Sequence, residues 1–217
     1  MVRMVLSNSL IQTFLKVAPG NRETVALSKI GWLMNDFDLV IVDLPASGHA
    51  VTMLEAPHTM VGLFSSGPIR SEGLNALQML KADTTHLILV SLPEEMVINA
   101  TIETFQKLQE VLPDLSINGV ILNRSDEVSF SEKEKGLLDL LSRENKDSSQ
   151  EVEELLWAGR WITQRGEASN KAQERLEKEL STTVCRLPRL SQNGGAKRLV
   201  SYMVEQLQQG DLTEGLL

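Results

Sequence analysis

The sequence contains one cysteine, Cys185, among its 217 residues. A single cysteine excludes an intramolecular disulfide and a zinc site built from several thiolates. Such low cysteine usage fits a reducing compartment, so we expect a cytoplasmic protein in which Cys185 is a buried strand residue.

Long apolar runs and basic stripes are also missing. No window reaches the ~18 continuous apolar residues of a membrane span, and polar side chains interrupt the N-terminal segment well short of a signal-peptide core. The formal net charge is -8, and no run of Lys or Arg is long enough to neutralise a phosphate backbone. We therefore expect no membrane insertion and no nucleic-acid partner.

The length suits one sizeable α/β domain over residues 1–217, and two smaller domains are the alternative. Short apolar runs predict buried strands at Leu39–Asp43, His86–Ser91 and Gly119–Asn123. A helical pattern follows each run, which is typical of a parallel sheet covered on both faces. Val184–Leu187 is a candidate last strand.

Helical patterns occupy much of the remaining sequence. The apolar spacing after Pro93 predicts a helix that runs through Ile98 and Leu108. Residues 125–150 are polar and are expected to form a mobile loop region, above all at 142–150. Further helices are expected at 2–17, 21–35, 151–181 and 196–209.

Asp43 ends the first predicted strand in the pattern of a Walker B strand. A carboxylate at the carboxyl end of a parallel sheet is placed to hold Mg2+, directly or through water. Gly48 would let a backbone N–H approach a γ-phosphate closely, which makes residues 43–50 a candidate nucleotide-sensing switch. From spacing alone an equal alternative remains, in which Asp43 only caps the following turn.

A longer match extends this pattern. The stretch DLPASGHA at 43–50, with Pro57 further on, closely resembles the D-T-A-P-T-G-H-T…P segment of the arsenite-pump and tail-anchored-protein-targeting ATPases. Three more segments follow in that family's order: PGNRE at 19–23, LVSLPEE at 89–95 and ILNR at 121–124. The resemblance covers residues 19–124, with a looser match at Leu187-Pro188 and in the closing helix.

The resemblance implies part of a SIMIBI-type P-loop NTPase, an α/β fold whose parallel sheet is flanked by helices. ATP and Mg2+ would be its cofactors. By the same resemblance, Asp43 is the catalytic carboxylate on the Mg2+ side and Gly48 senses the γ-phosphate. Asn123, Arg124 and Pro188 would lie on the adenine side of the nucleotide.

The family's phosphate-binding loop, G-x-x-x-x-G-K-[ST], has no counterpart in this sequence. The glycine and lysine cluster at 134–136 is expected to lie in a polar helix, and the cluster at 194–197 has the wrong spacing and no following Ser or Thr, so neither can substitute. The first switch, with its water-positioning aspartate, is also expected upstream of residue 19. By the family's topology, the missing phosphate-loop strand would lie between Leu39–Asp43 and His86–Ser91, so both strand edges would be unpaired.

Three arrangements would satisfy these edges: direct pairing of the two strands, a second copy of the chain, or a separate polypeptide that supplies the missing strand. We favour the last, in which the chain is the carboxyl-terminal half of a split ATPase and hydrolyses ATP only with a Walker A-bearing partner. A degenerate, non-catalytic α/β interaction module is the alternative, and a misassigned start at Met1 is a third. A neighbouring reading frame that encodes G-K-[ST] would favour the split ATPase.

The switch segment departs from the family pattern. Leu44 and Ala50 replace threonines, and Pro45-Ala46 inverts the family's Ala-Pro order, so nucleotide sensing is expected to differ or to be lost. His49 and His58 flank the switch, and a surface or structural role is favoured over a metal site or proton transfer.

Two apolar features are candidates for contact with a protein client. The segment 51–64 would line a groove for a client helix, but ordinary core is favoured because few residues separate the switch from the next strand. Trp157 and Trp161 lie one helical turn apart and would either anchor a partner or pack onto the sheet. Cys185 alone cannot capture arsenite, which needs about three thiolates.

Overall fold

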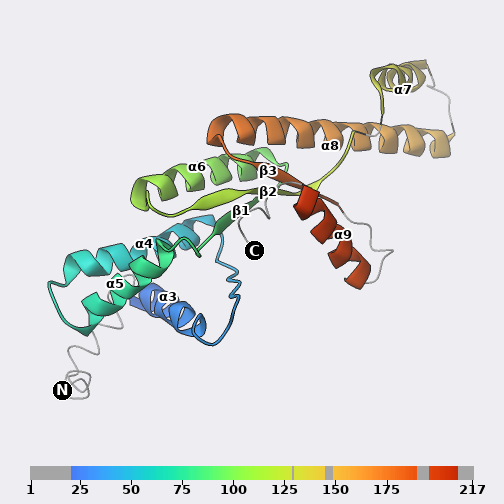
Figure 1. Ribbon diagram of the computed structural model, residues 1–217. Helices are drawn as coiled ribbons and strands as arrows, with labels where there is room; N and C mark the ends of the chain where they lie inside the picture. Colours follow the sequence, from blue (N-terminus) through green and yellow to red (C-terminus); the bar gives the residue numbers. More distant parts are fainter. Residues whose placement is uncertain (1–20, 129, 145–148, 190–195, 210–217) are drawn as a thin grey trace. The chain divides into compact units, whose positions relative to one another are not determined.

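The computed structural model describes residues 21–128, 130–144, 149–189 and 196–209 (Figure 1). The helix predicted at 2–17 lies outside these residues. The chain divides into two compact units, residues 1–86 with 104–116 and residues 87–103 with 117–217. The organisation expected from the length, one domain over residues 1–217, stays a prediction.

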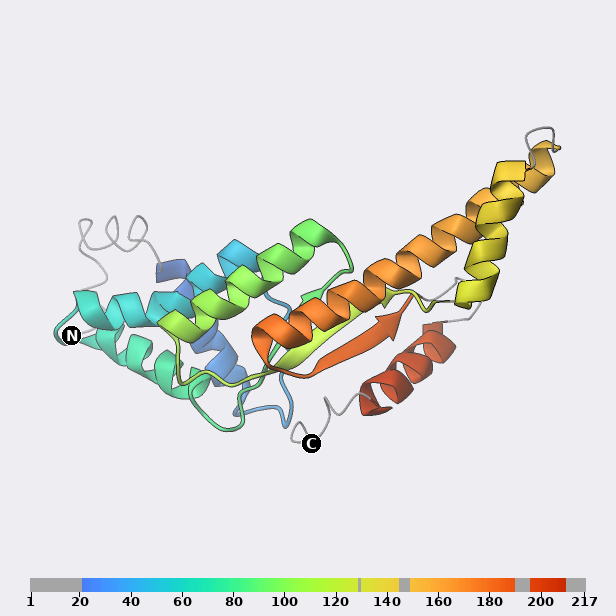
Figure 2. The same ribbon diagram turned by 90° about the horizontal axis from the view of Figure 1, so that it is seen from above.

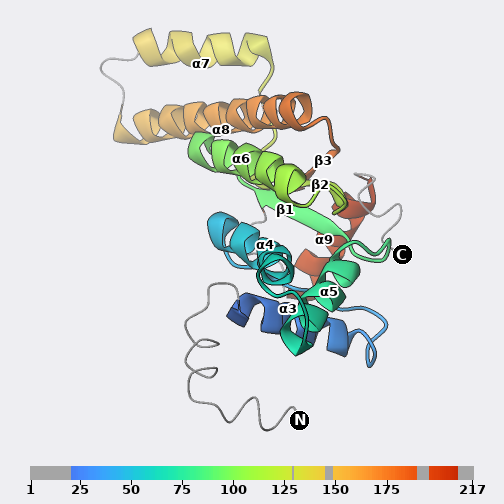
Figure 3. The same ribbon diagram turned by 90° about the vertical axis from the view of Figure 1, so that its left-hand side faces the viewer.

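In the first unit, three helices pack against one another: α3 (Asn21–Leu33), α4 (Ser47–Leu63) and α5 (Pro68–Leu80). Figure 3 shows them grouped together. α3 confirms the helix predicted at 21–35. The buried apolar side chains that these helices share are Leu27, Val51, Leu54, Ala56, Met60, Ala76 and Leu80. Segment 51–64 supplies several of them, so those positions belong to the core. This is the interpretation that the sequence favoured over an open groove for a client helix.

The turn between α4 and α5 holds the two helices close together. Gly67 has φ 98°, a left-handed conformation that favours glycine, and Pro68 begins α5 where no backbone N–H is needed. The Arg70 guanidinium donates to the carbonyl oxygen of Val61 and, at 2.9 Å, to that of Phe64. These bonds satisfy carbonyl groups that the end of α4 leaves without helical partners.

The second unit contains a parallel sheet in the order β1 (Leu87–Ser91), β2 (Ile117–Ser125) and β3 (Val184–Pro188). These strands confirm the predicted strands at 86–91 and 119–123 and the candidate strand at 184–187. The parallel direction of the sheet is confirmed as well.

β2 lies between its two neighbours, and its Val120 and Leu122 side chains are fully buried. α8 (Gln150–Leu180) packs against β2 and β3, and α9 (Ala196–Gln209) packs against β3. Figures 1 and 3 show α8 and α9 on opposite faces of this sheet. The sheet is therefore flanked by helices, as predicted, and both helices occur where the sequence places them.

The helix predicted after Pro93 is α6 (Glu95–Val111). Its periodic apolar positions are buried as expected: Ile98, Ile102, Phe105 and Leu108. Glu95 lies in the first turn, where a negative charge interacts favourably with the helix dipole.

The strand predicted at Leu39–Asp43 is wrong, because these residues form no strand. Leu39 and Ile41 are 68% and 85% exposed, and residues 38–45 make no backbone hydrogen bond to another described residue. An apolar run becomes a buried strand only where a neighbouring strand satisfies its N–H and C=O groups and other side chains cover its faces. The part of the chain that the structure describes supplies neither.

The loop predicted at 125–150 needs a correction too, because residues 132–144 form helix α7 (Glu132–Glu144). Ser131 and Glu134 cap it reciprocally. The Glu134 carboxylate accepts from the Ser131 N–H at 2.7 Å, and Ser131 Oγ accepts from the Glu134 N–H at 3.4 Å. These bonds to Ser131 lower the pKa of Glu134. Residues 145–148 lie outside the described residues.

α7 lies alongside α8, as Figure 2 shows. Lys135 on α7 binds Glu132 at 2.7 Å and Glu167 on α8 at 2.9 Å. Its hydrogen bonds to these two carboxylates raise the pKa of Lys135, and Lys135 in turn lowers the pKa of Glu167. Leu138 packs against Gly159. Asp139 on α7 also pairs with Arg160 on α8 at 3.7 Å. Ion pairs and an apolar contact thus hold the two helices together, within a sequence whose composition is mostly polar.

At Gly166, helix α8 crosses close to the segment that follows β2. A Cβ atom on Gly166 would lie 2.8 Å from the carbonyl oxygen of Glu127 and 2.9 Å from the N and Cα atoms of Val128. These are backbone atoms, which cannot turn aside as a flexible side chain can. Gly166 therefore lets α8 approach the carboxyl end of β2 closely.

We expect Gly166→Ala to lower the free energy of unfolding by about 1–3 kcal/mol, the usual range for overpacking. The measurement is thermal unfolding followed by circular dichroism. Gly136→Ala in α7 is the matched control, because a Cβ there would meet no atom within 4 Å, and it should be neutral or stabilise by about 0.5–1 kcal/mol. Equal losses in the two variants would contradict a special role for the contact of Gly166 with residues 127–128.

Candidate functional site

Two predicted site residues, Asp43 and Gly48, belong to the first unit. Asp43 is exposed and ends the segment 39–43, which precedes α4. Gly48 lies in the first turn of α4, whose N-cap residue, Ala46, provides no side-chain hydrogen bond. A Cβ at Gly48 would meet no atom within 4 Å. α4 thus begins without a side-chain cap. The His49 N–H donates to the Ala46 carbonyl oxygen at 3.0 Å, while the Gly48 N–H has no backbone acceptor among the described residues and is available to an external one.

The other three predicted site residues belong to the second unit and lie at the carboxyl edge of its sheet. Asn123 and Arg124 are among the last residues of β2, and Pro188 ends β3. Ser125 pairs with Pro188 across the two strands, and its carbonyl oxygen accepts the Arg189 N–H at 3.1 Å. The structure therefore brings Asn123, Arg124 and Pro188 to one edge, while their role toward a nucleotide stays a prediction.

Arg124 has an uncommon backbone conformation. Its φ is 53°, in the left-handed region that side-chain-bearing residues rarely adopt. Asn123 Oδ1 accepts the Arg124 N–H at 2.9 Å, which stabilises this turn at the end of β2. Such strain is found at functional sites more often than elsewhere.

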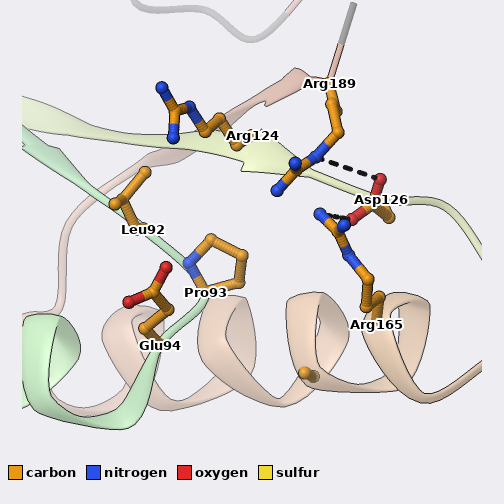
Figure 4. A pocket seen from close by; sticks show the side chains of 8 residues that line it. Leu92, Pro93, Glu94, Arg124, Asp126, Arg165 and Arg189 are labelled. Carbon is orange, nitrogen blue, oxygen red and sulfur yellow. Dashed lines mark ion pairs between the residues drawn. The ribbon is translucent and has the colours of Figure 1, made fainter. Parts of the chain in front are cut away.

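A pocket of about 280 Å³ opens at the same edge (Figure 4). Its walls come from the residues after β1, the end of β2, the segment after β3, and α8. They are Leu92, Pro93, Glu94, Arg124, Asp126, Arg165, Ala168 and Arg189. Ligands of parallel α/β sheets collect at the carboxyl ends of the strands, so this pocket is the candidate binding site of the second unit.

Asp126 connects the parts of this pocket. Arg165 Nη2 lies 2.5 Å from Asp126 Oδ2, and Arg189 Nε lies 3.9 Å from Oδ1, as the dashed lines in Figure 4 show. Asp126 Oδ2 is buried and accepts no hydrogen bond, so its close contact with Arg165 is an ion pair. The Asp126 N–H donates to Ser169 Oγ at 2.9 Å, and Arg186 donates to the Asp126 carbonyl oxygen at 2.6 Å. Two segments distant in sequence, α8 and the end of β3, are thereby tied to the end of β2.

A stack of aromatic side chains on α8 fixes Arg165 from its other side. The Arg165 Cζ atom lies 4.3 Å from the ring centroid of Trp161. Trp161 stacks on Trp157 with a centroid distance of 6.1 Å and an interplanar angle of 18°. Trp157 is 66% exposed, which argues against the alternative that it packs onto the sheet. The cation–π contact and the ion pair together hold Arg165 at the pocket wall.

Asp126, Arg165 and Arg189 are site residues that the sequence reasoning missed. For two of them a local signal existed, since Asp126 and Arg189 directly follow strand ends where ligands collect. Arg165 had only its helical spacing from Trp157 and Trp161, which does not reveal a partner on another element.

On their own, the described residues do not fit a complete ATP–Mg2+ site. The sequence has no phosphate-loop motif, and among the described residues no group of three or more His, Cys, Asp or Glu is placed to hold a metal ion. Mg2+ at phosphate sites usually takes one or two carboxylates, with phosphates and water as its other ligands. Asp43 is suited to be one such carboxylate, and no step of hydrolysis follows from this chain alone.

His49 and His58 are exposed on α4. The favoured interpretation of both as surface or structural residues fits this placement. Separately, none of the helices among the described residues is long and apolar enough to cross a membrane.

Replacing Asp126 by asparagine should reduce the free energy of unfolding by about 1–3 kcal/mol, because partly buried Arg165 then loses its counter-charge. The control is Asp139→Asn. Asp139 pairs with Arg160 at 3.7 Å, its side chain is 63% exposed, and the loss there should stay below about 0.5 kcal/mol. Urea unfolding of both variants measures the difference, and similar values for the two would contradict the central position of Asp126.

The buried thiol gives a chemical test of the β3 assignment. Cys185 is 2% exposed, and burial raises the pKa of its thiol. A higher pKa leaves less of the reactive thiolate at neutral pH. A disulfide reagent should therefore react far more slowly with the native chain than with the unfolded chain, and should need a higher pH than an exposed thiol does. Equal rates in both states would contradict this burial.

Comparison with known proteins identifies the family. The model of the ArsA-type family, described as anion-transporting ATPase, matches residues 2–141, which is more than half of the chain. ATPase BagA of Mycobacterium tuberculosis is 26% identical over 117 residues, which cover 50% of this chain and 34% of BagA. "Putative ATPase Mb3704" of Mycobacterium bovis matches with the same identity and coverage. The chain thus spans about a third of the length of these relatives. From the extent of the family match, the chain belongs to the anion-transporting ATPase family.

Proposed function

We propose that this chain supplies one half of an ATP–Mg2+ site whose phosphate loop is carried by a companion polypeptide. The observation that carries the proposal is the exposed segment 39–43, which is apolar, lacks a backbone partner among the described residues, and ends at Asp43. Membership of an ATPase family agrees with it. ATP would be hydrolysed only when both halves are present.

Exposure of the segment is costly unless a partner covers it. Phe37, Leu39 and Ile41, at alternate positions, are 60%, 68% and 85% exposed. Burying apolar surface contributes about 25 cal/mol per Å², and an added strand would also satisfy the free N–H and C=O groups. Any added strand would provide both gains, but only a companion polypeptide could also bring the phosphate loop that this sequence lacks, so we favour it over a second copy of this chain.

In this proposal the residues of the first unit act on the phosphate side. Asp43 would hold Mg2+, directly or through water. Gly48 would offer its backbone N–H to the γ-phosphate, because no side chain obstructs that approach and the N-terminus of α4 carries a partial positive charge. Asn123, Arg124 and Pro188 would bind the adenine side.

A non-catalytic interaction module is the second candidate. It is favoured by the same exposed apolar residues together with the absence of a metal-holding cluster among the described residues. In that case the companion would bind with or without nucleotide, and Asp43 would have no part in it.

The test is calorimetric titration with Mg-ATP of the chain alone, of the phosphate-loop protein encoded nearest to it, and of their mixture. We expect binding or turnover only in the mixture, and a loss of about tenfold or more with Asp43→Ala, because Mg2+ loses a charged ligand.

Asp38→Ala is the matched control, since Asp38 is exposed and directly precedes the same segment, and it should have no effect. A mixture that binds Mg-ATP no better than its parts would refute the split ATPase. A complex that forms equally well without nucleotide, and with Asp43→Ala, would establish the interaction module instead.

A further inference from the structure

The N-terminal part of helix α8, residues 150–162, carries several large apolar side chains that stay exposed. Figure 2 shows that this part of α8 extends past the sheet of the second unit, with α7 alongside it. Leu155 is 73% exposed, and the side chains of Trp157, Trp161 and Ile162 are exposed as well. Single apolar residues are normal on a protein surface, but a group of large neighbours indicates a contact site.

One face of α8 is covered at one end and open at the other. Leu155, Ile162, Ser169 and Leu176 follow one another every seven residues, which is close to two helical turns, so they lie along one face. Ser169 and Leu176 are fully buried in the part of α8 that packs against the sheet. Leu155 and Ile162 continue this face beyond the sheet, where both stay exposed.

Helical geometry places five apolar residues together on the open part of this face. At about 100° per residue, Trp157 and Trp161 lie on one side of it, and Leu155 and Ile162 lie on the other. Ala158, a small residue, lies between the two pairs. The two indole rings stack on each other, so they present a large surface that loses little conformational entropy on binding. Helix α7 packs on the other side of α8 and leaves this face open.

Two carboxylates stand at the N-terminal end of the same face. Glu151 and Glu154 lie within it by helical position, and both are exposed. Neither has a cationic partner among the described residues. The first Lys or Arg of α8 is Arg160, which pairs with Asp139. The face therefore combines apolar surface with negative charge that no described residue neutralises.

We propose that this face of α8 binds an amphipathic helix of a protein partner. The apolar stripe of that helix would pack over Ala158, between the two pairs of large side chains, and its Lys or Arg side chains would pair with Glu151 and Glu154. Amphipathic helices are commonly bound in this way, and tryptophan is enriched among the residues that dominate such interfaces.

The charge of the face decides between possible occupants. Complementary charge favours a basic partner helix and selects against acidic ones. An anionic membrane surface would be repelled by the same two carboxylates. A second copy of this chain would bring a further pair of unneutralised carboxylates to the interface, so we favour a different, basic polypeptide.

Binding at this face goes beyond the split ATPase. It requires neither Asp43, nor ATP, nor Mg2+, nor the companion polypeptide. A peptide can therefore fail to bind α8 while the mixture binds Mg-ATP, and the reverse, so that the two failures are separately visible.

The probes are two synthetic peptides of about 18 residues, long enough to form a helix. Both carry the same stripe of leucines, flanked by lysines in one peptide and by glutamates in the other. Tryptophan emission reports binding to the whole chain, in a Trp32→Phe background that leaves only Trp157 and Trp161. The lysine peptide should shift this emission to shorter wavelength, saturably and with an affinity that falls as salt is added. The glutamate peptide should cause no shift.

Variants of the face locate the binding. Leu155→Ser should weaken binding of the lysine peptide about tenfold or more, the loss typical of a central interface residue. Glu151→Gln together with Glu154→Gln should weaken it and remove most of its salt dependence. Leu140→Ser is the matched control, because Leu140 is an exposed leucine of α7 outside this face, and affinity should not change. All four positions are exposed, so circular dichroism should show each variant folded.

Several outcomes would overturn the proposal. They include no shift with the lysine peptide, equal shifts with both peptides, and equal weakening by Leu155→Ser and Leu140→Ser. Light scattering that shows a dimer of the chain alone, dissociated by Leu155→Ser, would assign the face to a second copy. Phosphatidylglycerol vesicles that shift the emission as far as the lysine peptide does would assign it to a lipid surface.

Discussion

The attachment of Asp126 is the interaction on which the second unit's binding edge depends. Its backbone N–H, its carbonyl oxygen and its carboxylate are each taken by a different group, from Ser169, Arg186 and Arg165. Because these groups come from α8 and β3, one residue after β2 holds three elements in a fixed relation. Arg165 can serve as a rigid pocket wall only because this carboxylate neutralises it.

This attachment in turn depends on close packing. Gly166 follows Arg165 and lets the helix backbone meet residues 127–128 without a side chain between them. A bulkier residue would move α8 away from the strand end and lengthen the Arg165 contact with Asp126. The Trp157 and Trp161 stack restrains Arg165 from the helix side. Packing and electrostatics therefore act on the same side chain and cannot be changed separately.

Local sequence patterns predicted those strands and helices whose formation depends mainly on nearby residues. The apolar runs at 86–91, 119–123 and 184–187 became strands because each finds a neighbour within the chain. The run at 39–43 has the same character, yet it forms no strand among the described residues, since strand formation needs a partner and not only β-propensity. The bounds of helix α7 were not predicted, because the region 125–150 is polar on average and was assigned mainly to a loop, although Ser131 and Glu134 have the spacing of a capping box.

Prediction of the site from the sequence is limited in the same way, because local patterns do not reveal contacts between distant segments. Asn123, Arg124 and Pro188 could be placed at the sheet edge, because the carboxyl ends of parallel strands meet there. The ion pair between Asp126 and Arg165 could not be foreseen, since it joins residues from β2's end and from the middle of a long helix. Pairing across such sequence separations is set by the fold and leaves no periodic signal in either segment.

Two features of the described residues, segment 39–43 and the pocket at the carboxyl edge of the sheet, differ in the interactions they offer. Segment 39–43 exposes apolar side chains, and its backbone groups have no partner among the described residues, a combination that a neighbouring strand would satisfy. The pocket presents the guanidinium groups of three arginines within a space of about 280 Å³. Backbone pairing would act on the first feature and charge on the second, so the two rest on different physical interactions. The exposed apolar segment 39–43 and the arginine-lined pocket are thus physically distinct features of the described residues.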